Sequence, residues 1–262
     1  MGTLLLPALR LAPGRLQCTD TLNMSSPDAV VNAHLAYLEA GARWLTTNTF
    51  CSEPLSLKNS GFAPETVAKT GAELAFEARA RFSHDQVQVM GSMGPGWRSP
   101  EKQEVEISEL YDIYRIWANG LLEGGVDGIC LETVTDLTQA ETAYRAVKSL
   151  STDCEIYVFL HVGPHLDAAQ LTQHIERVVQ LQPAGVGLNC SQLPSALKTA
   201  VAHLQTFSGL RLLKPNAGVP GHYVSPAAFA QQMAPYAEYI DAWGGCCGTS
   251  PEHIHALYDL LN

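Results

Sequence analysis

Residues 185–191, with the sequence GVGLNCS, are a short apolar run that ends in an asparagine, a cysteine and a serine. A mostly apolar run of this length is typical of a parallel strand that is buried on both faces. Its polar end places reactive side chains where the strand stops and the chain turns into a loop. The same arrangement recurs along the chain, and this recurrence decides which fold the sequence favours.

Apolar runs that are predicted strands alternate with amphipathic segments that are predicted helices. The predicted strands are residues 43–50, 87–94, 127–133, 155–162, 185–191, 210–216 and 238–245. The predicted helices are residues 28–42, 65–82, 109–125, 137–150, 167–182, 193–207, 225–239 and 250–262. This alternation predicts a parallel sheet. No linker interrupts it, so we expect residues 1–262 to form a single domain.

The polar strand endings favour a closed barrel over an open, doubly wound sheet. They read TNTF, GSMGP, LETVTD, GLNCS, KPNAG and GGCCGTS. A barrel brings the carboxyl ends of all its strands to one face, whereas an open sheet uses mainly those beside its switch point. A closed barrel needs eight strands, one more than the sequence supplies. We therefore predict an α/β fold, a (β/α)8 TIM barrel with a lacking or truncated first strand. Residues 1–10 could supply an irregular eighth strand.

The composition excludes several classes of function. The formal net charge of −10 disfavours binding to nucleic acid or to an anionic membrane surface. No apolar run is long enough for a transmembrane helix, and the N-terminus lacks the basic region of a signal peptide. Seven cysteines at irregular spacing argue against a disulfide framework and for a reducing compartment. A cytoplasmic location is expected.

Cys246 and Cys247 stand side by side after the last predicted strand. Adjacent residues of a strand point to opposite faces, so both thiols can reach one ligand only beyond the strand end. The glycines around them give the backbone that freedom. In a barrel, Cys190 would lie at the same face, and three converging thiolates suit zinc. The alternatives are ordinary buried thiols and a strained disulfide between the two neighbours.

A zinc ion with three protein thiolates keeps a fourth position for substrate. Three thiolates give the site a net charge of about −1, which weakens zinc as a Lewis acid. Hydrolysis is therefore less attractive than a reaction in which a substrate thiolate, deprotonated but still electron-rich, attacks an alkyl group.

Five stretches of the sequence resemble the zinc-dependent homocysteine S-methyltransferase family. This family includes the homocysteine domain of cobalamin-dependent methionine synthase and the betaine-dependent and S-methylmethionine-dependent enzymes. The stretches are AYLEAGARWLTTNTF, LETVTDL, GLNCS, KPNAGVP and GGCCGTSPEHI. The resemblance implies a (β/α)8 barrel, zinc on Cys190, Cys246 and Cys247, homocysteine as the acceptor and methionine as the product. It also implies that Glu132 holds the amino group of the substrate, and a carboxylate at a strand end is suited to that role.

Two asparagines are further candidates for substrate binding. Asn48 in TNTF and Asn216 in KPNAG would shape the pocket by hydrogen bonds, or each would simply fasten a loop. The methyl donor is not specified by the sequence. It could be methylcobalamin on a separate corrinoid protein, because the chain is too short to carry cobalamin and folate domains itself. Betaine, S-methylmethionine and S-adenosylmethionine are the other candidates.

The chain departs from the family pattern at its start. The family opens with a strand that ends in Asp-Gly-Gly, and this sequence begins after that point, at Met-Gly-Thr. One hypothesis is that Met1 is an internal methionine, which the N-terminal peptide of the natively expressed protein would test by mass spectrometry. If the short form is real, homocysteine binding is weakened. A methyltransferase for another thiol or selenol, or a non-catalytic zinc- or thiol-binding barrel, is then the alternative.

Overall fold

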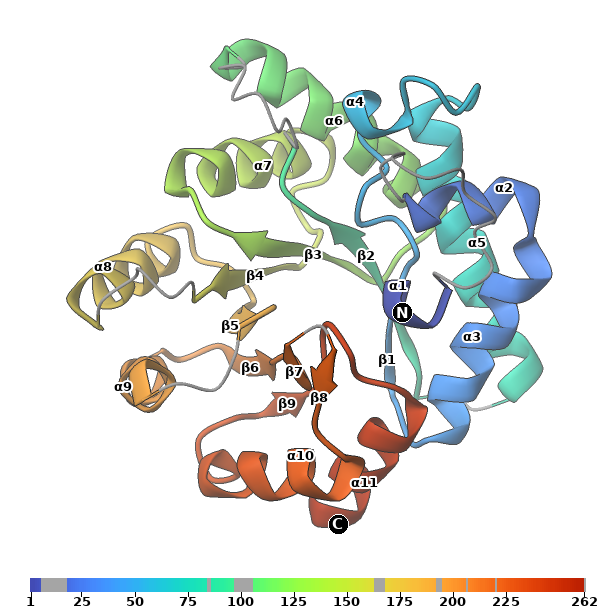
Figure 1. Cartoon of the computed structure of the whole chain (residues 1–262). Coiled ribbons are helices and arrows are strands. Elements are labelled where there is room, and N and C mark those ends of the chain that lie inside the picture. The colour runs from blue at the N-terminus through green and yellow to red at the C-terminus, as the bar shows by residue number, and fades with distance from the viewer. Residues whose placement is uncertain are drawn as a thin grey trace.

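A computed structural model describes residues 1–5, 18–83, 86–96, 106–162, 168–191, 195–205, 207–219 and 221–261. Its main feature is a curled parallel sheet of seven strands in the order β1-β2-β3-β4-β5-β6-β9 (Figure 1). These strands are β1 Trp44–Thr46, β2 Gln88–Met93, β3 Gly128–Val134, β4 Ile156–His161, β5 Gly185–Asn189, β6 Leu210–Lys214 and β9 Ala242–Trp243. Six lie within a predicted strand and β3 extends one residue beyond its predicted end, at Val134, so all seven strand predictions are confirmed.

The long helices lie outside the curled sheet, and each follows a strand or precedes one along the chain (Figure 1). They are α3 Pro27–Glu39, α5 Pro64–Phe82, α6 Ile107–Glu123, α7 Leu137–Leu150, α8 Ala168–Val179, α9 Ser195–Leu204, α10 Pro226–Met233 and α11 Pro251–Leu261. The predicted helices are confirmed, although residues 167, 193, 194, 206 and 262 of the predicted ranges lie outside the described residues. None of the described helices combines the length and the hydrophobicity needed to cross a membrane.

Several short elements were not expected from the sequence. They are α1 Gly2–Leu5, η2 Thr19–Thr21, α2 Leu22–Ser25, α4 Pro54–Leu57, η3 Ala234–Tyr236 and a hairpin of β7 Gly218–Val219 with β8 His222–Tyr223.

Helix starts follow ordinary capping rules. Asp136 accepts hydrogen bonds from the first-turn amides of α7, and Ser225 caps α10, whose first residue is a proline.

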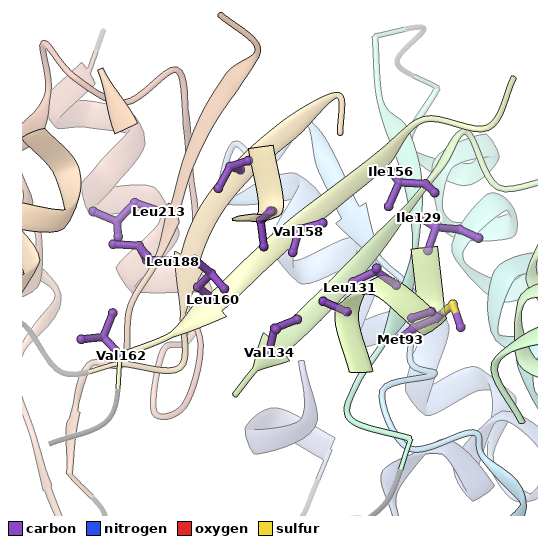
Figure 2. Packing of buried hydrophobic residues seen from close by; sticks show 14 of the residues in the cluster. Met93, Ile129, Leu131, Val134, Ile156, Val158, Leu160, Val162, Leu188 and Leu213 are labelled. Carbon is purple, nitrogen blue, oxygen red and sulfur yellow. The ribbon is translucent and has the colours of Figure 1, made fainter. Parts of the chain in front are cut away.

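The two faces of the sheet have different partners. Alternate strand residues such as Ile129, Val158 and Leu188 are fully buried in one large cluster with helices α6 to α9. Figure 2 shows the side chains of this outward face. The intervening residues point into the curled sheet, where Cys130 and Phe159 belong to a separate, smaller cluster. Polar residues of that inner face near the strand ends therefore project into the interior of the barrel.

In the described part of the chain, the barrel is not closed between β9 and β1. A cavity of about 470 Å³ lies there, lined by residues of both strands together with α3 and α11. Within the described residues no strand pairs with the outer edges of β1 and β9. Within the described residues the fold is thus an incomplete TIM barrel whose first strand is lacking or truncated, as the sequence predicted. We call this gap the open seam.

The expectation that residues 1–10 supply an irregular eighth strand is wrong for its first half. Gly2–Leu5 is the short helix α1, in which the amides of Leu4 and Leu5 donate to the carbonyl of Met1. These hydrogen bonds form locally, so the segment does not offer its amides to a neighbouring strand. Residues 6–10 lie outside the described part of the chain.

Candidate active site

Three cysteine thiols converge at the carboxyl end of the barrel. Cys190 follows β5, while Cys246 and Cys247 follow β9, and the three Sγ atoms lie within 4.8 Å of one another. The Sγ atoms of Cys190 and Cys247 are 3.8 Å apart. Zinc–sulfur bonds of about 2.3 Å in a tetrahedral site would place the sulfurs about 3.8 Å from each other. The donor set and its spacing therefore fit a soft divalent metal with one position left over.

The backbone at both cysteine loops turns sharply to bring the thiols together. Cys190 adopts a left-handed conformation with φ 51°, which redirects the chain immediately after β5. Gly248, with φ 79°, does the same after the cysteine pair, and a Cβ there would lie 2.2 Å from the ring of Tyr223. Glycine is thus required at position 248 for both conformation and space.

Asn216 joins the two cysteine loops. Its Oδ1 accepts a hydrogen bond from the amide of Cys247 at 3.0 Å, and its Nδ2 donates to the carbonyl oxygen of Cys190 at 3.2 Å. The amide of Cys246 also donates to the carbonyl of Pro215 at 2.8 Å. The structure therefore gives Asn216 a loop-fastening position directly behind the thiols, and its contact with substrate stays a prediction.

Contacts among the thiols and burial shift the pKa values of Cys190 and Cys246 upward. Contacts with Cys246 and Cys247, together with burial, raise the pKa of Cys190. For Cys246, the contact with Cys190 lowers the pKa, but the contact with Cys247 and burial outweigh it, and the net shift is upward. Three adjacent thiolates would repel one another in this setting, and a bound cation is the usual way for a protein to relieve such repulsion.

Glu132 lies in the barrel interior with only 7% of its surface exposed. An irregularity in the pairing of β3 with β4 lies beside it, and the next residue, Thr133, has φ 57°. Such bulges re-aim side chains near functional sites. Its Oε1 accepts from Ser92 Oγ at 2.8 Å, and its Oε2 accepts from Asn189 Nδ2 at 2.9 Å. The carboxylate is therefore fixed in one orientation.

Lys214 is a candidate functional residue that sequence reasoning missed, as were Ser92 and Asn189. Its Nζ lies 2.8 Å from Glu132 Oε2 and 4.6 Å from the centre of the Phe159 ring. The lysine begins the KPNAG stretch, which the sequence analysis used only for Asn216. A signal was available, because Lys214 follows inward-facing Leu212 at strand spacing.

Asn48 lies in the loop after β1 and is almost fully buried. Its Nδ2 donates to the carbonyl of Thr19 at 2.8 Å and to Oδ1 of Asn23 at 3.0 Å. These contacts fasten the β1 loop to the segments η2 and α2. Of the two roles expected for Asn48, the structure gives it the loop-fastening one, and substrate binding stays a prediction.

The fold and the thiol centre define an incomplete TIM barrel with three converging thiols at the carboxyl end of its strands. The homocysteine S-methyltransferase family model matches residues 1–261. The chain therefore belongs to the homocysteine S-methyltransferase family, a family of methyltransferase enzymes.

Named relatives agree with this assignment. The methionine synthases of Mycobacterium leprae (strain TN) and Mycobacterium tuberculosis (strain ATCC 25618 / H37Rv) are 30% and 31% identical to the chain over 261 and 271 residues. Each alignment covers 92% of this chain, but the chain spans only 22% of the length of either relative. The metallated homocysteine methyltransferase MmuM from Escherichia coli has a TM-score of 0.78 at 20% identity, covering 97% of this chain and 92% of that structure. That likeness shows the fold.

Proposed function

We propose that the chain transfers a methyl group to the thiol of homocysteine and yields methionine, with zinc held by Cys190, Cys246 and Cys247. The observation that carries this proposal is the convergence of three thiols within 4.8 Å at the barrel end that also holds the buried carboxylate of Glu132. The relatives named methionine synthase and homocysteine methyltransferase support the same acceptor.

In this proposal the residues have three roles: binding the metal, binding the substrate, and holding the binding side chains in position. When bound, zinc supplies a Lewis acid that lowers the pKa of the incoming thiol. Glu132 binds the substrate ammonium, and Ser92 and Asn189 hold that carboxylate in place. Asn216 keeps the two cysteine loops at a fixed separation. In the proposed reaction the substrate thiol would give up its proton to solvent. Its sulfur–methyl bond would then form as the donor–methyl bond breaks, and the donor would leave with that bond's electron pair.

The donor is left open among four chemical classes. A methylated corrinoid on a separate protein, betaine, S-methylmethionine and S-adenosylmethionine each carry a transferable methyl group. The chain spans about a fifth of the length of its methionine synthase relatives.

A donor screen combined with metal analysis tests the proposal. We expect about one zinc ion per chain after anaerobic purification and formation of methionine with one of the four donors. Cys246→Ser should lose both the zinc ion and methionine formation. Cys154→Ser should keep both, because Cys154 lies just before the amino end of β4, at the opposite end of the barrel from the thiol centre. Absence of zinc in the unmodified protein would contradict the proposal.

A non-catalytic thiol-binding barrel is the second candidate, and the open seam is the observation that favours it. The seam removes one wall of the interior beside the site, since Lys214 and Gly244 line the same cavity as β1. Stoichiometric zinc and homocysteine binding without turnover on any donor would support this candidate instead.

A further inference from the structure

The ion pair between Glu132 and Lys214 is buried, and its position is unusual for a purely structural contact. The two side chains are 8% and 16% exposed and meet at 2.8 Å. Removing two charges from water is costly, and replacing such a pair by apolar residues is often neutral or stabilising. Glu132 already accepts hydrogen bonds from Ser92 and Asn189. Lys214 therefore adds a positive charge to a carboxylate that neutral donors already orient.

Lys214 lies between the thiol centre and Glu132. Its backbone carbonyl accepts a hydrogen bond from the amide of Cys190 at 3.2 Å, and its aliphatic stem passes Gly244, two residues before Cys246. Its head group lines the cavity and lies over Phe159.

The pair presents a negative and a positive charge side by side, and the backbone of Lys214 also contacts Cys190 of the thiol centre. An α-amino acid carries the complementary pattern, an ammonium and a carboxylate on the same carbon. We propose that Lys214 is a specificity-determining residue that binds the α-carboxylate of the thiol substrate while Glu132 binds its ammonium. This inference rests on the proposed function and deepens it, because it restricts the substrates to amino-acid thiols.

Two analogues of homocysteine separate recognition of the carboxylate from a structural role. In 3-aminopropane-1-thiol the carboxylate is missing, and in 4-sulfanylbutanoate the ammonium is missing. The zinc-loaded protein should prefer homocysteine over 3-aminopropane-1-thiol roughly 10- to 100-fold in kcat/KM, the range expected for one hydrogen-bonded charge pair. Lys214→Met should lose most of that preference. Homocysteine loses the partner of its carboxylate in this variant, whereas 3-aminopropane-1-thiol has no carboxylate to lose a partner.

The loss in Lys214→Met should fall on KM more than on kcat, since the lysine binds substrate and does not touch the reacting atoms. Lys214→Arg should recover part of the preference. Lys69→Met is the matched control, because Lys69 forms an ion pair with Glu123 at 3.3 Å on the surface. Zinc content and the circular dichroism spectrum of each variant report whether the site is still folded.

Equal losses for homocysteine and for 3-aminopropane-1-thiol in Lys214→Met would overturn the inference, because they indicate a structural role. The same comparison made by calorimetric binding keeps the two proposals apart. If no donor supports turnover but binding still depends on the carboxylate through Lys214, the proposed function fails and the inference stands. If turnover occurs with the same substrate preference in Lys214→Met, the inference fails and the function stands. Failure of homocysteine to bind would overturn both.

Discussion

Strand β9 has two edges, and they meet different surroundings. Along the edge toward β6, hydrogen bonds continue past the strand end, from Gly244 to Leu213, from Cys246 to Pro215 and from Ala217 back to Cys247. The other edge faces β1 across the open seam, a cavity of about 470 Å³. In that cavity the imidazole of His34 is fully buried, and neither ring nitrogen has a hydrogen-bond partner in the described part of the protein.

This difference indicates that the thiol centre and barrel closure are separable. Backbone hydrogen bonds and the side chain of Asn216 join the cysteine loops to β6 and the residues that follow it. The loops therefore converge through contacts that do not involve the open seam. Among the described residues, the open seam instead leaves strand edges without a pairing strand and the buried imidazole of His34 without a hydrogen-bond partner, which lowers stability. Metal binding should therefore respond to changes on the β6 side, and stability under acid conditions should respond to changes in the seam.

The largest expected effect concerns the two asparagines. Asn216→Ala removes the bridge between the cysteine loops, and the affinity for zinc should fall roughly 10- to 100-fold, as for other supporting residues of metal sites. Asn48→Ala is the matched control, because it removes buried hydrogen bonds from the loop after β1 and should reduce stability without changing zinc affinity. Competition with a chromogenic chelator measures the zinc affinity of both variants. Equal zinc affinities in the two variants would contradict the separation.

The second effect concerns His34 in the seam. Burial, and secondly the charge of the Met1 amino group, lower the pKa of His34 to about 3 from 6.5. Because the pKa is lower in the folded state, the unfolded state takes up the proton more readily. Proton uptake by the unfolded state lowers the free energy of unfolding. This loss of stability is absent above pH 6.5 and grows as the pH falls toward 3. At pH 5 it amounts to about 2 kcal/mol, since each pH unit contributes about 1.4 kcal/mol.

His34→Leu should remove that acid sensitivity and fill the same space with an apolar side chain. Urea unfolding at pH 7.5 and at pH 5 measures the acid sensitivity. Between these two pH values the free energy of unfolding should fall less in the variant than in the unmodified protein. His255→Gln, at an exposed position on α11, is the control and should behave like the unmodified protein. An unchanged pH dependence in His34→Leu would show that other groups cause the acid sensitivity.

The fold and the site differ in how much of them the sequence could predict. Strand and helix positions follow from local patterns, and the convergence of Cys190 with Cys246 and Cys247 follows from their places after two strands of a barrel. Strand spacing indicates that Lys214 points inward, but its pairing with Glu132, like that of Ser92, depends on which side chains meet across the barrel interior, and no local pattern contains that information. Helix α1 was missed because MGTLLL carries an apolar run that suits a strand equally well.

The smallest expected effect lies at the far end of the same β6–β9 edge. Arg211 and Asp241 form a two-point ion pair there, with nitrogen–oxygen distances of 2.8 and 2.7 Å, and the amide of Arg211 also donates to Asp241. Arg211 lowers the pKa of Asp241, so the stabilisation is complete above pH 3.8 and is lost as the pH falls below that value. Both side chains are partly exposed, and Arg211→Met should therefore cost only about 0.5–1 kcal/mol at pH 7.

The pair Arg177–Glu141, between α8 and α7, is the control for this last change, because it links two helices on the outside of the barrel at 2.9 Å. If the β6–β9 edge depends on hydrogen bonds along its whole length, Arg211→Met should lower the hydrogen-exchange protection of the Gly244 amide, which bonds to Leu213, while Arg177→Met should not. Zinc affinity should remain unchanged in both variants. A loss of zinc in Arg211→Met would mean that the cysteine loops depend on the whole strand and not only on the contacts of Asn216 beyond its end.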